Sequence, residues 1–146
     1  MKLDMKRILI ADGDADSCGY IGRILIRRKI CDSIDVVHDG AYVCEKLVSA
    51  AYGLAIIELD LPDVSGLRVI RNIRENGLDV PILGLASRPD PLLAAQVVLS
   101  GAQDLIFKPI LLDSFVYSIK KLRDNRRLGH CDMLQRLNLP LVNARN

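Results

Sequence analysis

The segment Leu54-Ala55-Ile56-Ile57 constrains the fold most strongly, because every one of its side chains is apolar. In a β-strand, successive side chains point to opposite faces of the sheet. A strand without a polar face has to be covered on both sides, which is typical of a parallel sheet packed between helices. A membrane-spanning helix would need about 20 apolar residues, and the longest weakly interrupted apolar stretch of the chain, Pro91–Ala102, is too short for one.

Further apolar segments and helical patterns alternate with this strand along the chain. We expect strands at 7–11, 33–38, 54–57, 81–86 and 105–107. The expected helices are one that Asp14, Asp16 or Ser17 can cap, and four more at 41–51, 67–75, 91–100 and 112–127. In the second helix, Val43, Leu47 and Val48 are expected to share the apolar face. This alternation predicts an α/β doubly wound fold, and right-handed crossovers favour a flavodoxin-like parallel sheet of order 2-1-3-4-5 with five helices on its two faces.

The 146 residues make one domain with an ordinary core. We expect this domain to cover residues 5–127, and residues 128–146 to be a C-terminal tail able to form a short amphipathic helix. The net charge of +2 combines a balance of −3 for residues 1–119 with +5 for residues 120–146. A total near neutrality disfavours a dedicated nucleic-acid binder, and the basic residues near 120–127 either complement a helix dipole or contact an acidic partner or nucleic acid. Without a recognisable signal peptide, we expect a cytoplasmic protein with reduced cysteines.

Chemically useful side chains follow the ends of four expected strands. They are Asp12 and Asp14 after the first strand, Glu58 and Asp60 after the third, Ser87 after Ala86 of the fourth, and Lys108 with Pro109 after the fifth. Ligands of doubly wound folds bind beyond the carboxyl ends of the strands. Carboxylates from two neighbouring strands would therefore face one lysine, although polar residues also gather at loop junctions for purely structural reasons.

Three ordered motifs, at Arg7–Asp12, Leu54–Gly66 and Gly101–Pro109, resemble the receiver domain of bacterial two-component response regulators. The resemblance covers about residues 5–125. It implies that a histidine kinase phosphorylates an Asp at the end of the third strand, and that acidic residues after the first strand help to bind Mg²⁺. It further implies that a Ser or Thr and a Lys hold the phosphoryl oxygens, and it suggests a cis peptide bond between Lys108 and Pro109.

The sequence departs from the family pattern at the positions that carry this chemistry. Glu58 takes the acceptor position, Gly13 follows Asp12 where a second acid is usual, Ala86 takes the Ser/Thr position with Ser87 one residue late, and Leu105 replaces the switch aromatic, whereas Lys108, Pro109, Pro62 and Gly66 are kept. A Glu carboxylate lies about 1.5 Å further out than that of Asp, and a misplacement of about 1 Å can cost about 10²-fold in rate. We therefore expect the phosphorylation machinery to be disabled.

The sequence leaves two interpretations of Glu58 open. In one, its carboxylate reaches Lys108 and partly mimics a phosphorylated Asp, although one charge imitates a phosphoryl group of about −1.5 to −2 poorly. In the other, Glu58 is a remnant in a scaffold that binds partners constitutively. The alternative to both is a working Mg²⁺-dependent phosphoacceptor with Glu58 in an altered acidic pocket of Asp12, Asp14 and Asp60. We expect no enzymatic activity and no cofactor, and Mg²⁺ at these aspartates only in that alternative.

The expected partners follow from the surface. The helix at 91–100 is too apolar to bury all its side chains, and Leu92 and Leu99 share a stripe that the sheet does not cover. We expect this stripe to bind a signalling protein or a histidine kinase, or to form a homodimer through the fourth helix, fifth strand and fifth helix, as receivers do. We expect no membrane contact, and no direct DNA binding because the tail is too short for a DNA-binding domain. A flavodoxin-like cofactor site is disfavoured because Asp12 and Asp14 would repel phosphate.

Overall fold

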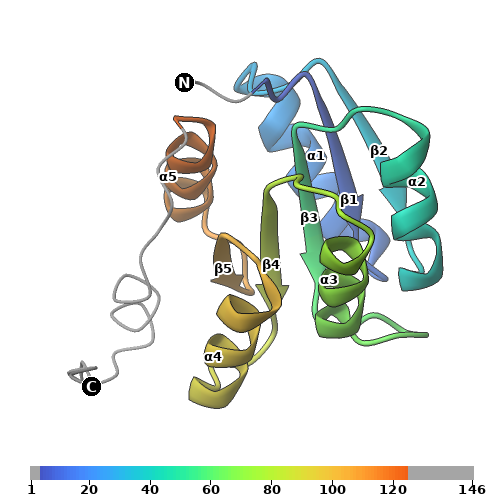
Figure 1. The fold of residues 1–146 in the computed structure, drawn as a ribbon. Coiled ribbons are helices and arrows are strands. Elements are labelled where there is room, and N and C mark those ends of the chain that lie inside the picture. Colours follow the sequence, from blue (N-terminus) through green and yellow to red (C-terminus); the bar gives the residue numbers. More distant parts are fainter. Residues whose placement is uncertain (1–3, 125–146) are drawn as a thin grey trace.

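The computed structural model describes residues 4–124 and forms a parallel sheet with the strand order β2-β1-β3-β4-β5 (Figure 1). The elements are β1 (Arg7–Ala11), α1 (Ala15–Arg27), β2 (Ser33–Val37), the 3₁₀ helix η1 (Gly40–Tyr42), α2 (Val43–Ser49), β3 (Leu54–Glu58), α3 (Gly66–Glu75), β4 (Ile82–Ala86), α4 (Pro91–Ser100), β5 (Asp104–Phe107) and α5 (Leu112–Arg123). The predicted fold class and strand order are confirmed. The predicted tail lies outside the described residues.

Two apolar cores lie on the two faces of the sheet. Along β1, Ile8 and Ile10 pack against α1 and α5, whereas Leu9 and Ala11 pack against α2, α3 and α4. This division follows from the alternation of side chains along a strand. All five residues of β3 are buried, as the apolar segment at its centre predicts. The sheet is therefore covered on both faces, and its carboxyl edge carries the polar side chains.

Both ends of α1 are closed by local hydrogen bonds. Of the three candidate caps, Asp14 is the one used, and its Oδ1 accepts a hydrogen bond from Asp16 N at 2.9 Å. At the other end, Lys29 N bonds to the Ile26 carbonyl and Ile30 N to the Leu25 carbonyl. This pattern is a Schellman motif, whose left-handed position usually holds glycine. Here Lys29 occupies it with φ +55°.

The second helix differs from its prediction. The expected helix at 41–51 is a 3₁₀ turn followed by the seven-residue α2. The turn starts early because the Asp63 carboxylate accepts hydrogen bonds from Gly40 N and Ala41 N at 2.7 and 3.0 Å. Val48, expected on the apolar face, is 70% exposed, because it lies five residues beyond Val43 and outside the helix's apolar stripe. The last helix, expected to reach residue 127, ends at Arg123.

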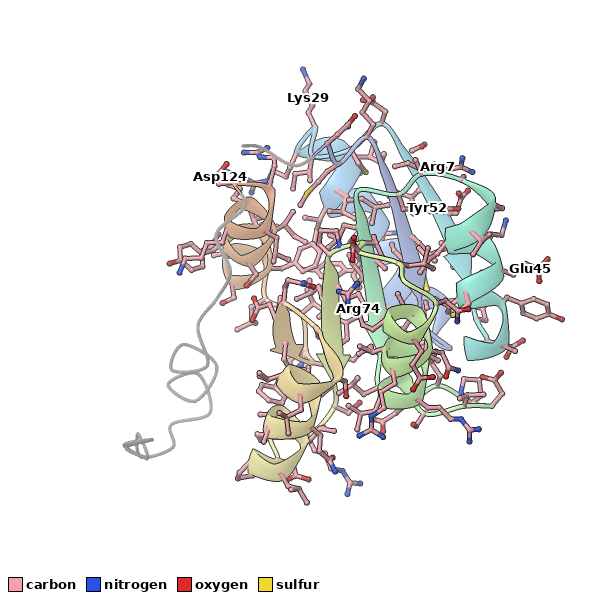
Figure 2. The ribbon with its side chains drawn as sticks, viewed as in Figure 1. Arg7, Lys29, Glu45, Tyr52, Arg74 and Asp124 are labelled. Carbon is pink, nitrogen blue, oxygen red and sulfur yellow. The ribbon has the colours of Figure 1, made fainter. Side chains whose placement is uncertain are left out.

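A single side chain ties together the loops that precede β4 and β5. Arg74, at the end of α3, donates hydrogen bonds of 2.8 to 3.1 Å to the carbonyls of Leu78, Val80 and Gly101 and to Gln103 Oε1. Figure 2 labels Arg74 between these elements. These contacts join the end of α3, the α3–β4 loop and the α4–β5 loop into one unit.

A second cluster fixes the edge of the sheet at β2. Asp35 Oδ2 accepts hydrogen bonds from Arg7 Nε at 2.7 Å and from the Tyr52 hydroxyl at 2.5 Å. The Arg7 guanidinium also lies 5.0 Å from the centre of the Tyr52 ring, and the two residues are neighbours in Figure 2. Together these contacts lower the pKa of Asp35, with the Tyr52 hydrogen bond as the largest cause.

Candidate functional site

The centre of the site is an ion-pair network between three strand ends. Lys108 follows β5, and its Nζ lies 2.7 Å from Glu58 Oε1 at the end of β3 and 2.9 Å from Asp12 Oδ2 beyond β1. Asp12 is fully buried and the Glu58 residue is 7% exposed. One cation is thus shared between two buried carboxylates, as expected where the carboxyl ends of neighbouring parallel strands meet.

Backbone N–H groups hold the other oxygens of the two carboxylates. Asp12 Oδ1 accepts a hydrogen bond from Asp14 N at 2.9 Å, and Glu58 Oε2 accepts one from Gly13 N at 3.2 Å. Asp12 Oδ2 lies 2.9 Å from the Lys108 ammonium, whose charge compensates it. The β1–α1 loop and the β3 carboxylate are therefore joined directly.

The contact between the two carboxyls shifts their pKa values in opposite directions, whereas Lys108 lowers both. Burial and the neighbouring Asp12 carboxyl raise the pKa of Glu58. Burial alone would raise the pKa of Asp12 as well, but its hydrogen bonds with Glu58 and Asp14 N and the charge of Lys108 lower it. The two carboxylates keep the pKa of Lys108 above its usual value despite its burial. Near neutral pH the network holds a charged Lys108 and an ionised Asp12.

The remaining predicted acids do not join this network. Asp14 is exposed and is used as the cap of α1. Asp60 is exposed directly beyond the end of β3. The structure thus brings Asp12, Glu58 and Lys108 together and leaves Asp14 and Asp60 outside.

The Ser/Thr position and the aromatic position also differ in kind from the family pattern. Ala86 is buried at the end of β4, and its carbonyl accepts a hydrogen bond from Lys108 N at 2.7 Å. Ser87 is exposed beyond it. Leu105 is buried in β5 against Gly84, where its Cδ1 would lie 3.2 Å from an added Cβ. The bond between Lys108 and Pro109 is cis.

The residues present do not fit the Mg²⁺ ion that the receiver fold implies. Mg²⁺ needs oxygen ligands in near-ideal octahedral geometry. Asp12 Oδ2 already pairs with the Lys108 ammonium, which repels a cation, and Asp14 caps its helix. Within residues 4–124 no group of three metal-binding side chains comes together.

Two residues next to the network were missed in the sequence. The ring Nδ1 of His38 lies 2.9 Å from the Asp12 carbonyl, and Cys18 Sγ donates a weak hydrogen bond to the same oxygen at 3.5 Å. Burial is the main cause that raises the pKa of Cys18 to about 11, so this thiol stays protonated and unreactive. His38 directly follows β2, and the rule that neighbouring strand ends meet at one edge would have found it.

Comparison with known proteins agrees with this architecture. Residues 8–120 match the response regulator receiver domain. The chain belongs to this family. It is 26% identical over 131 residues to the transcriptional regulatory protein TctD of Salmonella typhimurium, covering 90% of this chain and 57% of that protein. A two-component response regulator from Clostridium difficile has a similar structure, with 27% identity, a TM-score of 0.73 and coverage of 86% of this chain and 100% of that one.

A second similar structure is the receiver domain of the Saccharomyces cerevisiae response regulator Ssk1 in complex with the histidine phosphotransfer protein Ypd1. It has a TM-score of 0.75 at 21% identity and covers 88% of this receiver chain and 94% of that chain. This chain spans only about half the length of the curated relatives it matches, 57% of TctD and 50% of DltR from Streptococcus agalactiae. Between residues 4 and 124, no helix has the length and apolar character needed to cross a membrane.

Proposed function

We propose that this chain is an atypical receiver that works without phosphorylation and acts by binding other proteins in a two-component signalling pathway. The observation that carries the proposal is the contact between Glu58 and Lys108. Both oxygens at the acceptor position are already engaged, Oε1 by the ammonium at 2.7 Å and Oε2 by Gly13 N at 3.2 Å. The lysine that would hold a phosphoryl oxygen therefore already has its counter-charge.

The surroundings of Glu58 support the same proposal. Ala86 supplies no hydroxyl for a phosphoryl oxygen, and the capping role of Asp14 removes a ligand that Mg²⁺ would need. A buried Leu105 also leaves no aromatic ring to change position on activation. In this proposal the Lys108 network is permanent, and the chain has no phosphoacceptor or phosphatase activity of its own.

The binding surface that we propose is the face formed by α4, β5 and α5. Leu92 and Leu99 on α4 are 66% and 85% exposed, in agreement with the predicted stripe. Leu111 and Tyr117 extend the exposed apolar surface toward α5 and line a groove of about 550 Å³ beside β5. We propose a second copy of the chain or a signalling protein such as a histidine kinase or phosphotransfer protein as its partner. The Ypd1–Ssk1 complex gives a precedent for the last of these.

Phosphoryl uptake tests the proposal directly. The full chain and a Glu58→Asp variant are treated with acetyl phosphate and Mg²⁺, and their intact masses are measured. We expect no phosphoryl adduct on the wild-type chain, and an adduct on wild type would refute the proposal in favour of the altered phosphoacceptor. An adduct on Glu58→Asp alone would show that the rest of the site is competent, and no adduct on either would show that it has degenerated.

Sedimentation tests the surface separately. We expect the wild-type chain to self-associate with rising concentration, or to bind a histidine kinase or phosphotransfer protein, and Leu99→Glu to abolish this association. The matched control is Val48→Glu, since Val48 is similarly exposed but lies on α2. Equal association of the two variants would exclude the α4 face.

A further inference from the structure

A groove of about 600 Å³ lies between α1 and β2, away from the α4 face. Its floor is apolar: Ile26 and Val36 are 46% and 40% exposed, and Ile34 is half-buried. The groove ends at His38, which contacts the Asp12 carbonyl. Apolar side chains that stay exposed along one groove form a surface that a partner can cover.

Two glycines inside α1 keep this groove open. Gly19 and Gly22 both line it, and glycine is the least favourable residue of a helix interior after proline. A Cβ at Gly22 would lie 3.5 Å from Ile34 Cδ1, so a larger side chain there would extend over the floor. The helix thus contains two unfavourable residues on the side where side chains would fill the groove.

The other wall of the groove is an edge strand. β2 pairs with β1 on one side and is the last strand of the sheet, as Figure 1 shows. Its residues are more exposed than those of β3 and β4, which are wholly buried. The outer backbone groups of an edge strand are a template for an added strand. An extended segment is therefore the shape of occupant that this groove fits.

The charge along the groove selects the occupant. Arg23 and Arg27 line it, are exposed, and form no ion pair within residues 4–124. They lie one helical turn apart, about 6 Å along the axis. Side chains on one face of a strand repeat every two residues, about 6.6–6.8 Å apart. Acidic residues two positions apart in an added strand would match the axial spacing of the two arginines.

We propose that the α1–β2 groove binds an extended acidic segment of a partner protein, which adds to the edge of β2 and places two carboxylates of one strand face at Arg23 and Arg27. A second copy is disfavoured because it would bring two arginine pairs together. The chain's own residues 125–146 carry four arginines against one aspartate, so their charge is also wrong. The proposal does not depend on the state of the Lys108 network.

The test uses the full ¹⁵N-labelled chain and a synthetic ten-residue peptide of alternating Val and Glu. We expect amide shifts confined to β2 and the groove side of α1, with a Kd tighter than about 1 mM. Arg23→Glu/Arg27→Glu should weaken binding at least tenfold. The matched control is Arg68→Glu/Arg71→Glu, which makes the same charge change on exposed residues of α3 and should leave the Kd within about twofold.

Other results would overturn the proposal. These are the absence of shifts at about 1 mM peptide, shifts centred on α5, equal weakening by both double variants, or equal binding of a Val–Lys peptide. Concentration-dependent shifts at β2 in the protein alone would assign the groove to a second copy instead. Far-UV circular dichroism of each variant separates loss of binding from loss of fold.

Discussion

Replacement of Lys108 by Met tests whether one cation holds the centre of the site together. At 2.7 and 2.9 Å, and with an effective dielectric constant of about 20, each contact is worth about 6 kcal/mol of gross Coulomb attraction. Desolvation and the repulsion between Asp12 and Glu58 offset most of this attraction. Removing one partner of a buried ion pair costs about 3–5 kcal/mol, because the other charge is left uncompensated. We expect Lys108→Met to lose about that much free energy of unfolding at pH 7.5.

The loss should depend on pH with a definite sign. Without Lys108, burial and mutual repulsion raise the pKa values of both acids in the folded state above their unfolded values. The folded variant then binds more protons than the unfolded chain, so its stability falls as pH rises from about 4 upward. The difference from wild type should be smaller at pH 5 than at pH 7.5. Glu58→Gln added to Lys108→Met should recover part of the loss, because it removes one of the two uncompensated charges.

Urea denaturation followed by far-UV circular dichroism measures these effects, since the chain has no tryptophan to report by fluorescence. Lys46→Met on the exposed face of α2 is the control, and it should stay within about 0.5 kcal/mol of wild type. A loss below about 1 kcal/mol for Lys108→Met, or a loss that grows as the pH falls, would refute the view that Lys108 compensates two buried charges.

Three further predictions concern other parts of the fold. Gly66→Ala should lower the free energy of unfolding, measured by urea denaturation, by about 3 kcal/mol or more, because its Cβ would lie 2.3 Å from the Glu58 carbonyl oxygen. Gly22→Ala, whose Cβ has room, should stabilise α1 by about 1 kcal/mol. Similar results for both variants would contradict the geometry. Lys29→Gly should raise the free energy of unfolding by about 0.5–1 kcal/mol, because the position has φ +55°; no change or a loss would mean that the Lys29 backbone is not strained. Asp35 has a lowered pKa in the folded state, so its contribution to the free energy of unfolding is present above pH 3.8 and is lost as the pH falls through the folded pKa. In an acid titration, Asp35→Asn should therefore lose stability less steeply than wild type. Parallel curves would exclude a stabilising role of the Asp35 carboxylate.

Much of the architecture was predictable because it depends on patterns that each strand carries by itself. A segment such as Leu54–Ile57 has no polar face, so it has to be a covered parallel strand. The grouping of Asp12, Glu58 and Lys108 followed from the rule that strand ends meet at one edge. Two kinds of feature were not predictable. Whether Asp14 turns to its helix or to the site depends on competing hydrogen bonds, and the early turn at Gly40 depends on Asp63 from a distant loop.

The hydrogen bonds of Arg74 bear on what controls the amount of partner that such a chain binds. They tie the end of α3 to the loops that precede β4 and β5, so the α4–β5 loop beside the proposed binding face is fixed before a partner arrives. A surface that is always in its competent form loses no affinity to an inactive fraction. If the Lys108 network is permanent, as we propose, occupancy of the partner would follow the concentration of the chain alone. Synthesis and degradation would replace the kinase as the input, and the response time would be that of protein turnover.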